Sequence, residues 1–254
     1  MRTPKRLRKS SPTDHRARFL KRRQVSPGPS APALRKSLSS SALTLRTLMI
    51  TAAIRFELGD HHTYDFVEGH LPSEMFPTLR EVISATDDFF SYADIADLDS
   101  CLRALDHLDA YVMAEGPFDA ILAFSQGASI AASYLAQRMQ RDPDAERASA
   151  PPFRCAIFFS APAAYDLDSL KRGHFRALTR AVDGELIRIP TAHIWGRNDT
   201  TIDAATVSGL CAPDTAEVYV HEGGHEVPGV RMNAAVRSSV QIIRRVISTA
   251  TYGQ

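Results

Sequence analysis

The sequence predicts an α/β domain: a mostly parallel β-sheet flanked by helices, with no separate second domain. Short apolar runs typical of buried strands alternate with longer amphipathic segments along most of the chain. Strands that alternate with helices form parallel sheets joined by crossover helices. The length of 254 residues and the apolar fraction of 44% suit one such domain of roughly 200 residues with a substantial core.

The expected elements follow the chain in order. Gly59 is predicted to end the first helix, and residues 68–97 are expected to be irregular and to lie over the site. Residues 167–182 are expected to form a helical or lid segment. The predicted strands are 63–67, 120–124, 153–159, 191–195 and 217–221, and the predicted helices are 49–58, 98–113, a helix directly after residue 127, 202–210 and 230–249.

Charge divides the chain into a basic tail and an acidic domain. Residues 1–48 hold 13 of the 30 Lys and Arg residues and one of the 29 acidic residues, so residues 49–254 carry a formal charge of −11. The tail is rich in Arg, Ser and Pro and lacks apolar periodicity, which predicts disorder. Three other interpretations stay open: a mitochondrial transit peptide, a nuclear or nucleic-acid-binding patch, and an inaccurate gene model. Phe19 is the one aromatic residue of the tail, which disfavours nucleic-acid binding.

The composition also favours a cytoplasmic protein. Cys101, Cys155 and Cys211 are odd in number and far apart, which argues against a disulfide framework and a zinc site and fits a reducing compartment. No apolar run approaches the roughly 20 residues of a membrane span. We therefore expect no membrane partner, no nucleic-acid partner and no metal or organic cofactor.

The chemistry is predicted to centre on Ser125. An apolar strand at residues 120–124 ends at Ser125-Gln126-Gly127, and a helix of small residues follows. A serine on a sharp strand-to-helix turn is the context of a nucleophile elbow, with the pattern G-x-S-x-G. Ala123 replaces the first glycine of that pattern with another small residue, and Gly127 supplies the second. The alternative is that Ser125 only caps the helix.

An acid and a base follow in an order that favours catalysis. Asp199 comes just after the strand at 191–195, and His225 lies in the loop Glu222-Gly-Gly-His-Glu-Val-Pro after the strand at 217–221. The carboxyl ends of parallel strands form the edge where α/β sites lie. Ser, Asp, His is the order found in α/β-hydrolases. Asp203 is the runner-up for the acid, and Asp199 could otherwise serve only as a helix cap.

The other histidines lack such a setting. His193 and His221 lie inside predicted strands and are expected to be structural. The remaining histidines outside the tail have no strand-end context: His61, His62, His70, His107 and His174. His225 is therefore the predicted base. Ser125 would attack an acyl carbonyl, His225 would carry the proton, Asp199 would orient the imidazole, and the Gln126 N–H would stabilise the oxyanion.

These motifs together resemble the fungal serine hydrolase family of the α/β-hydrolase superfamily. They are Ala-Phe-Ser125-Gln-Gly-Ala, Gly-Arg-Asn-Asp199 and Glu-Gly-Gly-His225-Glu-Val-Pro, with Phe66-Val-Glu-Gly and Gly116-Pro-Phe-Asp as weaker matches, and the resemblance runs from about residue 50 to the C-terminus. The resemblance implies a small cytosolic esterase, or a thioesterase that releases polyketides in fungal secondary metabolism. The implied substrates are carboxylic esters or acyl thioesters, including a polyketide bound to the acyl-carrier domain of a synthase.

One family feature is missing. The family normally opens with a central strand that runs into a Leu-His-Gly loop, which supplies the second oxyanion donor; this chain has no His-Gly dipeptide. Residues 43–48 would be a weak replacement strand. Two explanations fit: a chain N-terminally truncated by its gene model, or a degenerate paralogue. The sequence therefore leaves three hypotheses, namely an active acyl hydrolase, a weakened or inactive hydrolase-like scaffold, and a thioesterase or acyltransferase acting on a carrier domain.

Overall fold

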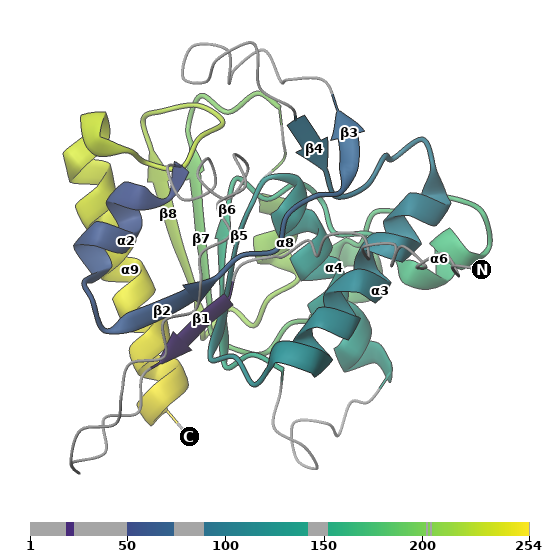
Figure 1. Cartoon of the computed structure of the whole chain (residues 1–254), viewed down its shortest axis with the longest axis horizontal. Coiled ribbons are helices and arrows are strands. Elements are labelled where there is room, and N and C mark those ends of the chain that lie inside the picture. The colour runs from purple at the N-terminus through teal and green to yellow at the C-terminus, as the bar shows by residue number, and fades with distance from the viewer. Residues whose placement is uncertain are drawn as a thin grey trace, which may run out of the picture.

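The computed structural model describes residues 19–22, 50–73, 89–141, 152–201, 203 and 205–253. In these parts of the chain a six-stranded sheet, in the order β2-β1-β5-β6-β7-β8, lies between two groups of helices (Figure 1). Its strands are β1 (Phe19–Arg22), β2 (His62–Asp65), β5 (Ala120–Phe124), β6 (Cys155–Phe159), β7 (Thr191–Gly196) and β8 (Ala216–His221). The helices are α2 (Ala52–Leu58), α3 (Leu98–Glu115), α4 (Gln126–Arg141), α6 (Leu167–Lys171), α7 (Arg180–Asp183), α8 (Ala205–Gly209), the 3-10 turn η2 (Val230–Met232) and α9 (Asn233–Tyr252).

Strands β5 to β8 are parallel, as the sequence predicts. Phe124 pairs with Phe159, and Phe159 pairs with Ile194 on the next strand. Gly196 pairs with His221 at the end of β7 and β8. Because the strands run in one direction in this register, their carboxyl ends meet along one edge of the sheet. The loops that carry Ser125, Asp199 and His225 all leave from that edge.

The two faces of the sheet have separate apolar cores. Helices α2 and α9 cover one face, and α3 and α4 cover the other (Figure 1). Strand β6 shows the alternation that this requires: Ile157 and Phe159 belong to the core under α9, while Ala156 and Phe158 belong to the core under α4. All of β6 is buried, which explains why it appears in the sequence as a continuous apolar run.

Most predicted elements are found with small shifts at their ends. The elbow strand has the predicted bounds, and Gly59 ends α2 with φ 91° while its N–H bonds the Arg55 and Phe56 carbonyls. Residues 202–210 were expected to form one helix, but α8 covers only Ala205–Gly209. The segment predicted as irregular at 68–97 contains a small hairpin, β3 (Leu71–Ser73) with β4 (Phe89–Ser91), which stands beside the carboxyl edge (Figure 1).

Strand β1 lies within residues 1–48, the segment that the sequence predicts to be disordered. Residues 19–22 pair antiparallel with all of β2 and, through Phe19 and Leu20, with the start of β5. The rest of the tail, including the suggested strand at 43–48, lies outside the described residues. The pairing of β1 has a physical reason. Without β1, the edges of β2 and β5 would carry unpaired backbone N–H and C=O groups, and a short extended segment satisfies them. Local composition carries no signal for such distant pairing.

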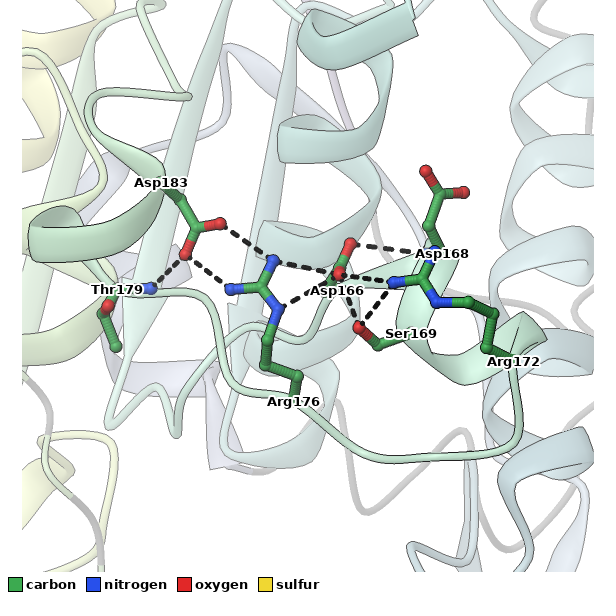
Figure 2. A network of polar contacts seen from close by, with 7 residues as sticks. All are labelled: Asp166, Asp168, Ser169, Arg172, Arg176, Thr179 and Asp183. Atoms are coloured by element: carbon green, nitrogen blue, oxygen red, sulfur yellow. Dashed lines mark hydrogen bonds and ion pairs between the residues drawn. The ribbon is translucent and has the colours of Figure 1, made fainter.

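An ion-pair network holds together the segment between β6 and β7. Arg176 donates two hydrogen bonds to Asp183 (3.0 and 2.9 Å) and one to Asp166 (3.1 Å), as Figure 2 shows. Asp166 also accepts from the Ser169 hydroxyl at 2.7 Å, and Asp183 accepts from the Thr179 N–H at 2.8 Å. The two carboxylate side chains are only 10% and 7% exposed. One guanidinium therefore neutralises two nearly buried acids.

The network makes part of the stability depend on pH. Burial acts to raise the pKa of Asp166 and of Asp183, but the hydrogen bonds from Ser169, Arg176 and the Thr179 N–H outweigh it and hold both pKa values below the ordinary 3.8. A carboxyl with a depressed pKa in the folded state adds stability that is complete above its unfolded pKa and is lost as the pH falls through its folded pKa. This contribution is therefore present at neutral pH and disappears in acid.

We expect Arg176→Ala to lower the free energy of unfolding by about 2 kcal/mol at pH 7, because it leaves two nearly buried carboxylates without their shared cation. Urea denaturation would measure this. Arg103→Ala is the control, since the Arg103–Asp97 pair is half exposed and should contribute less than about 1 kcal/mol. The difference between wild type and Arg176→Ala should shrink below about pH 4. A constant difference from pH 7 to pH 3 would contradict the electrostatic explanation.

Candidate active site

Ser125 stands on a strained turn between β5 and α4. Its φ of 53° lies in the left-handed region that non-glycine residues rarely adopt. The Ser125 N–H bonds the Phe159 carbonyl at 3.0 Å, and the Ser125 carbonyl accepts the N–H groups of Ala128 and Ser129, which starts the helix. A capping serine would have an extended backbone and would direct its hydroxyl to the helix. Here the hydroxyl meets His225, so the elbow interpretation fits the geometry.

The structure brings the three predicted residues together. His225 Nε2 lies 2.8 Å from Ser125 Oγ, and His225 Nδ1 lies 2.8 Å from Asp199 Oδ2. The acceptor at Asp199 fixes the tautomer, so Nδ1 carries the proton and Nε2 accepts from the serine hydroxyl. The Phe124 ring lies 5.1 Å from the His225 ring between centroids and packs along the imidazole. Both hydrogen bonds that a Ser-His-Asp triad needs are therefore in place.

Asp199 is held as a carboxylate. Its side chain is 1% exposed, and its Oδ1 accepts from the Thr201 hydroxyl at 2.6 Å and from the Thr201 N–H at 3.0 Å. Burial acts to raise the pKa of Asp199, but the hydrogen bonds from Thr201 and His225 outweigh it and lower the pKa below its ordinary value. One carboxylate oxygen is thus occupied by Thr201, and the other is free to orient the imidazole.

Hydrogen bonds join the acid loop to the histidine loop. The Arg197 N–H donates to the His221 carbonyl at 2.7 Å, and the Asn198 N–H donates to the Gly223 carbonyl at 3.0 Å. The Asn198 carboxamide donates to the Glu222 carbonyl at 2.6 Å. Three bonds from two successive residues therefore fix the start of the His225 loop against the start of the Asp199 loop. In the Gly-Arg-Asn-Asp motif, Arg197 and Asn198 therefore connect the acid loop to the histidine loop.

Gly196 permits this approach. A Cβ built at Gly196 would collide with the carbonyl oxygens of Gly223 and Gly224. Any side chain there would push the two loops apart, because both contacts are with backbone atoms that have no freedom to move aside. His221 also holds this turn, since its buried Nδ1 accepts the Gly223 N–H at 3.1 Å. Gly223 and Gly224, which precede His225, are therefore held in place by contacts with Gly196 and His221.

The remaining sequence candidates lie apart from this cluster. Asp203, the alternative acid, is exposed, and its backbone carbonyl accepts from Thr206 at the start of α8. His193 is buried in β7, where its Nε2 lies 3.0 Å from the Thr191 hydroxyl and burial lowers its pKa to about 4. The roles of Asn198 and Thr201 were not predicted from the sequence. Asn198 directly precedes Asp199 and Thr201 follows it by two residues, so proximity to the predicted acid was the one available signal.

The Gln126 N–H, the predicted oxyanion donor, is the first amide of α4. The first amides of a helix have no acceptor within the helix, and the positive end of the helix dipole lies at the same N-terminus. Within the described ranges, no group of three or more His, Cys, Asp or Glu residues could hold a metal ion. Over the same residues, no helix has both the length and the apolar composition that a bilayer crossing demands.

A parallel sheet with a left-handed serine at the end of one strand, an acid after a later strand and a histidine after the next defines an α/β-hydrolase. The sequence profile of the family described as "Serine hydrolase (FSH1)" matches residues 33–235, so the chain belongs to that family of serine esterase-type hydrolases. The match begins inside the basic tail, earlier than the resemblance of the motifs from about residue 50 indicates.

The chain is similar to several individual proteins. The chain is 35% identical over 210 residues to Esterase FPY3 of Fusarium mangiferae, covering 81% of this chain and 92% of the relative. It is 36% identical over 222 residues to Hydrolase FUB4 of Gibberella moniliformis, covering 65% of this chain and 80% of the relative. Among solved structures, a carboxylesterase from Mesorhizobium loti aligns with a TM-score of 0.48 and 15% identity, covering 80% of this chain and 82% of that one.

We expect Thr201→Val to lower kcat for ester hydrolysis by about three- to tenfold without changing KM, since it removes one hydrogen bond worth about 1 kcal/mol from the Asp199 carboxylate. Steady-state kinetics at pH 7 would measure the change. Thr201→Ser is the control, because it keeps the hydroxyl and should stay close to wild type. Equal losses in the two variants would contradict the role of the hydrogen bond, because Thr201→Ser keeps the hydroxyl.

Asn198→Ala should lower kcat about tenfold, because it releases the Glu222 carbonyl and loosens the loop that carries His225. Its neighbour provides the control: Arg197 contacts Glu222 through an ion pair with 62% and 78% exposed side chains, so that Arg197→Ala should change kcat less than about twofold. Both variants would be compared by kcat and by thermal melting. A large loss in Arg197→Ala and none in Asn198→Ala would refute the role assigned to the carboxamide.

Proposed function

We propose that the chain hydrolyses carboxylic esters or acyl thioesters through an acyl-enzyme on Ser125. The observation that carries the proposal is the continuous chain of two 2.8 Å contacts from Ser125 Oγ through His225 to Asp199. Neutral His225 accepts the serine proton as Ser125 Oγ attacks the acyl carbon, and the imidazolium that forms is stabilised by the Asp199 carboxylate. Protonated His225 then gives the proton to the leaving alcohol or thiol. A water molecule, activated by His225 in the same way, releases the acid.

The oxyanion of each tetrahedral intermediate would be stabilised by the Gln126 N–H. This donor sits at the residue directly after the nucleophile, and α4 holds it in a fixed orientation, so it needs no reorganisation during the reaction. In the family pattern a second donor comes from the loop after the neighbouring central strand. A fixed donor of this kind contributes about 10²–10³ to kcat where one has been removed from a related site.

The substrate could be free or carried by a partner. Esters of small carboxylic acids are the simplest class, and the names of the relatives, esterase and hydrolase, agree with it. A polyketide or other acyl thioester on the acyl-carrier domain of a synthase is the finer proposal, with a place in fungal secondary metabolism. The three buried free thiols fit a reducing compartment such as the cytoplasm. Turnover that depends on a carrier domain would separate the two substrate classes.

A catalytically weakened hydrolase is the second candidate, and strand β1 favours it. The strand between β2 and β5 runs antiparallel to β5. Its carboxyl end, at Arg22, therefore points toward the edge opposite Ser125. In the family pattern, by contrast, the central strand runs toward the nucleophile. A weakened enzyme would still react with a phosphonate but would turn over esters slowly.

We expect a fluorophosphonate probe to label the wild-type protein at Ser125. Ser125→Ala and His225→Ala should abolish labelling, and Asp199→Asn should lower kcat by about 10⁴ because the imidazole loses its charged orienting partner. Asp203→Asn is the matched control and should behave as wild type, since Asp203 lies outside the hydrogen-bonded set. A folded wild-type protein that resists the probe would refute the hydrolase proposal for this chain. Rapid labelling with negligible ester turnover would instead support the weakened enzyme.

A further inference from the structure

The side chain of Gln126 has a role that the reaction itself does not require. Its Oε1 accepts the Tyr92 N–H at 2.7 Å and the Ala93 N–H at 3.3 Å, and its Nε2 donates to the Ala93 carbonyl at 2.7 Å. The carboxamide therefore binds the backbone that follows β4 as a neighbouring strand would. Only glutamine has both the acceptor and the donor at this reach.

This clamp fixes an aromatic ring next to the nucleophile. Tyr92 lies against Gly127, where a Cβ would come within 3.3 Å of the ring atom Cε2. The other end of the ring is held as well, because the Tyr92 hydroxyl donates to the Val67 carbonyl at 2.9 Å. The ring is only partly buried and lies on the residue two positions after Ser125. The ring therefore packs on the first turn of α4, beside the nucleophile.

The backbone segments around the Tyr92 ring are closely packed. A Cβ at Gly69 would collide with the backbone of Ser91, the residue before Tyr92. The segment after β2 therefore lies directly on the end of β4. Gln126 clamps that end from the other side. Tyr92 is consequently held by its backbone N–H, by its hydroxyl and by the contact of its ring with Gly127.

We propose that Gln126 is a positioning residue that fixes Tyr92 as a wall of the acyl-group pocket, so that this pair limits the size of the acyl chain accepted by Ser125. The proposal rests on the proposed function, since it concerns the specificity of the same site. The Gln126 backbone N–H serves the oxyanion and the carboxamide serves the wall. One residue therefore links the stabilisation of the reacting oxygen to the selection of the acyl group.

The clamp can be tested without any turnover. Hydrogen–deuterium exchange should show the Tyr92 and Ala93 amides exchanging about tenfold faster in Gln126→Ala than in wild type, because both lose their acceptor. Gln126→Glu should fall between the two, since a carboxylate keeps the acceptor and loses the donor. Gln241→Ala, a glutamine on the exposed face of α9, is the matched control and should leave both amides protected. Unchanged exchange in Gln126→Ala would overturn the clamp.

The specificity role is tested with p-nitrophenyl esters of increasing acyl length, which share one leaving group. Gln126→Ala and Tyr92→Ala should each raise the ratio of kcat/KM for long over short acyl chains by about tenfold, because both open the same wall. Gln241→Ala should keep the wild-type ratio. A uniform loss over the whole series would overturn the wall and leave only a structural brace. A wild-type protein that hydrolyses no ester would instead refute the proposed function and the specificity role with it, while the exchange measurement still decides the clamp.

Discussion

The strained backbone at Ser125 is the constraint on which the rest of the site depends. A non-glycine residue in the left-handed region costs about 1–3 kcal/mol and persists only where its surroundings determine it fully. Here β6 supplies an acceptor for the Ser125 N–H, and the first turn of α4 uses the Ser125 carbonyl. Ser160, at the end of the adjacent strand, also has a positive φ, of 41°. The left-handed turn at Ser125 places its hydroxyl within hydrogen-bond distance of His225.

Much of this arrangement follows from local sequence patterns. The apolar run at Ala120–Phe124, ended by Ser125 and followed by small residues, predicts the elbow because each feature lies within a few residues of the next. The order of Ser125, Asp199 and His225 predicts their meeting because parallel strands place their carboxyl ends at one edge. The fold class, the bounds of β5 and the end of α2 at Gly59 were predictable for the same reason.

The parts that were not predictable depend on distances across the fold. The Asn198 carboxamide reaches a carbonyl 24 residues away, and Gln126 binds backbone 33 and 34 residues earlier. Neither partner is marked by its own residue type, since the contacts are with main-chain atoms. Strand β1 is the extreme case, because its pairing is decided by two strand edges far away in sequence and its own composition resembles a disordered tail. Side chains that bind backbone leave little trace in a single sequence.

Helix α9 carries none of the proposed site residues, yet it packs on β6, β7, β8 and α2 and so supports the strands from which the acid and histidine loops leave. It is also the last helix of the chain, as its position at the C-terminal end in Figure 1 makes plain. Domains made on the ribosome form their contacts as the chain emerges. The nucleophile strand is therefore synthesised long before its base and the helix that supports it. The assembled site therefore depends on a helix that leaves the ribosome after all three of the loops that carry Ser125, Asp199 and His225.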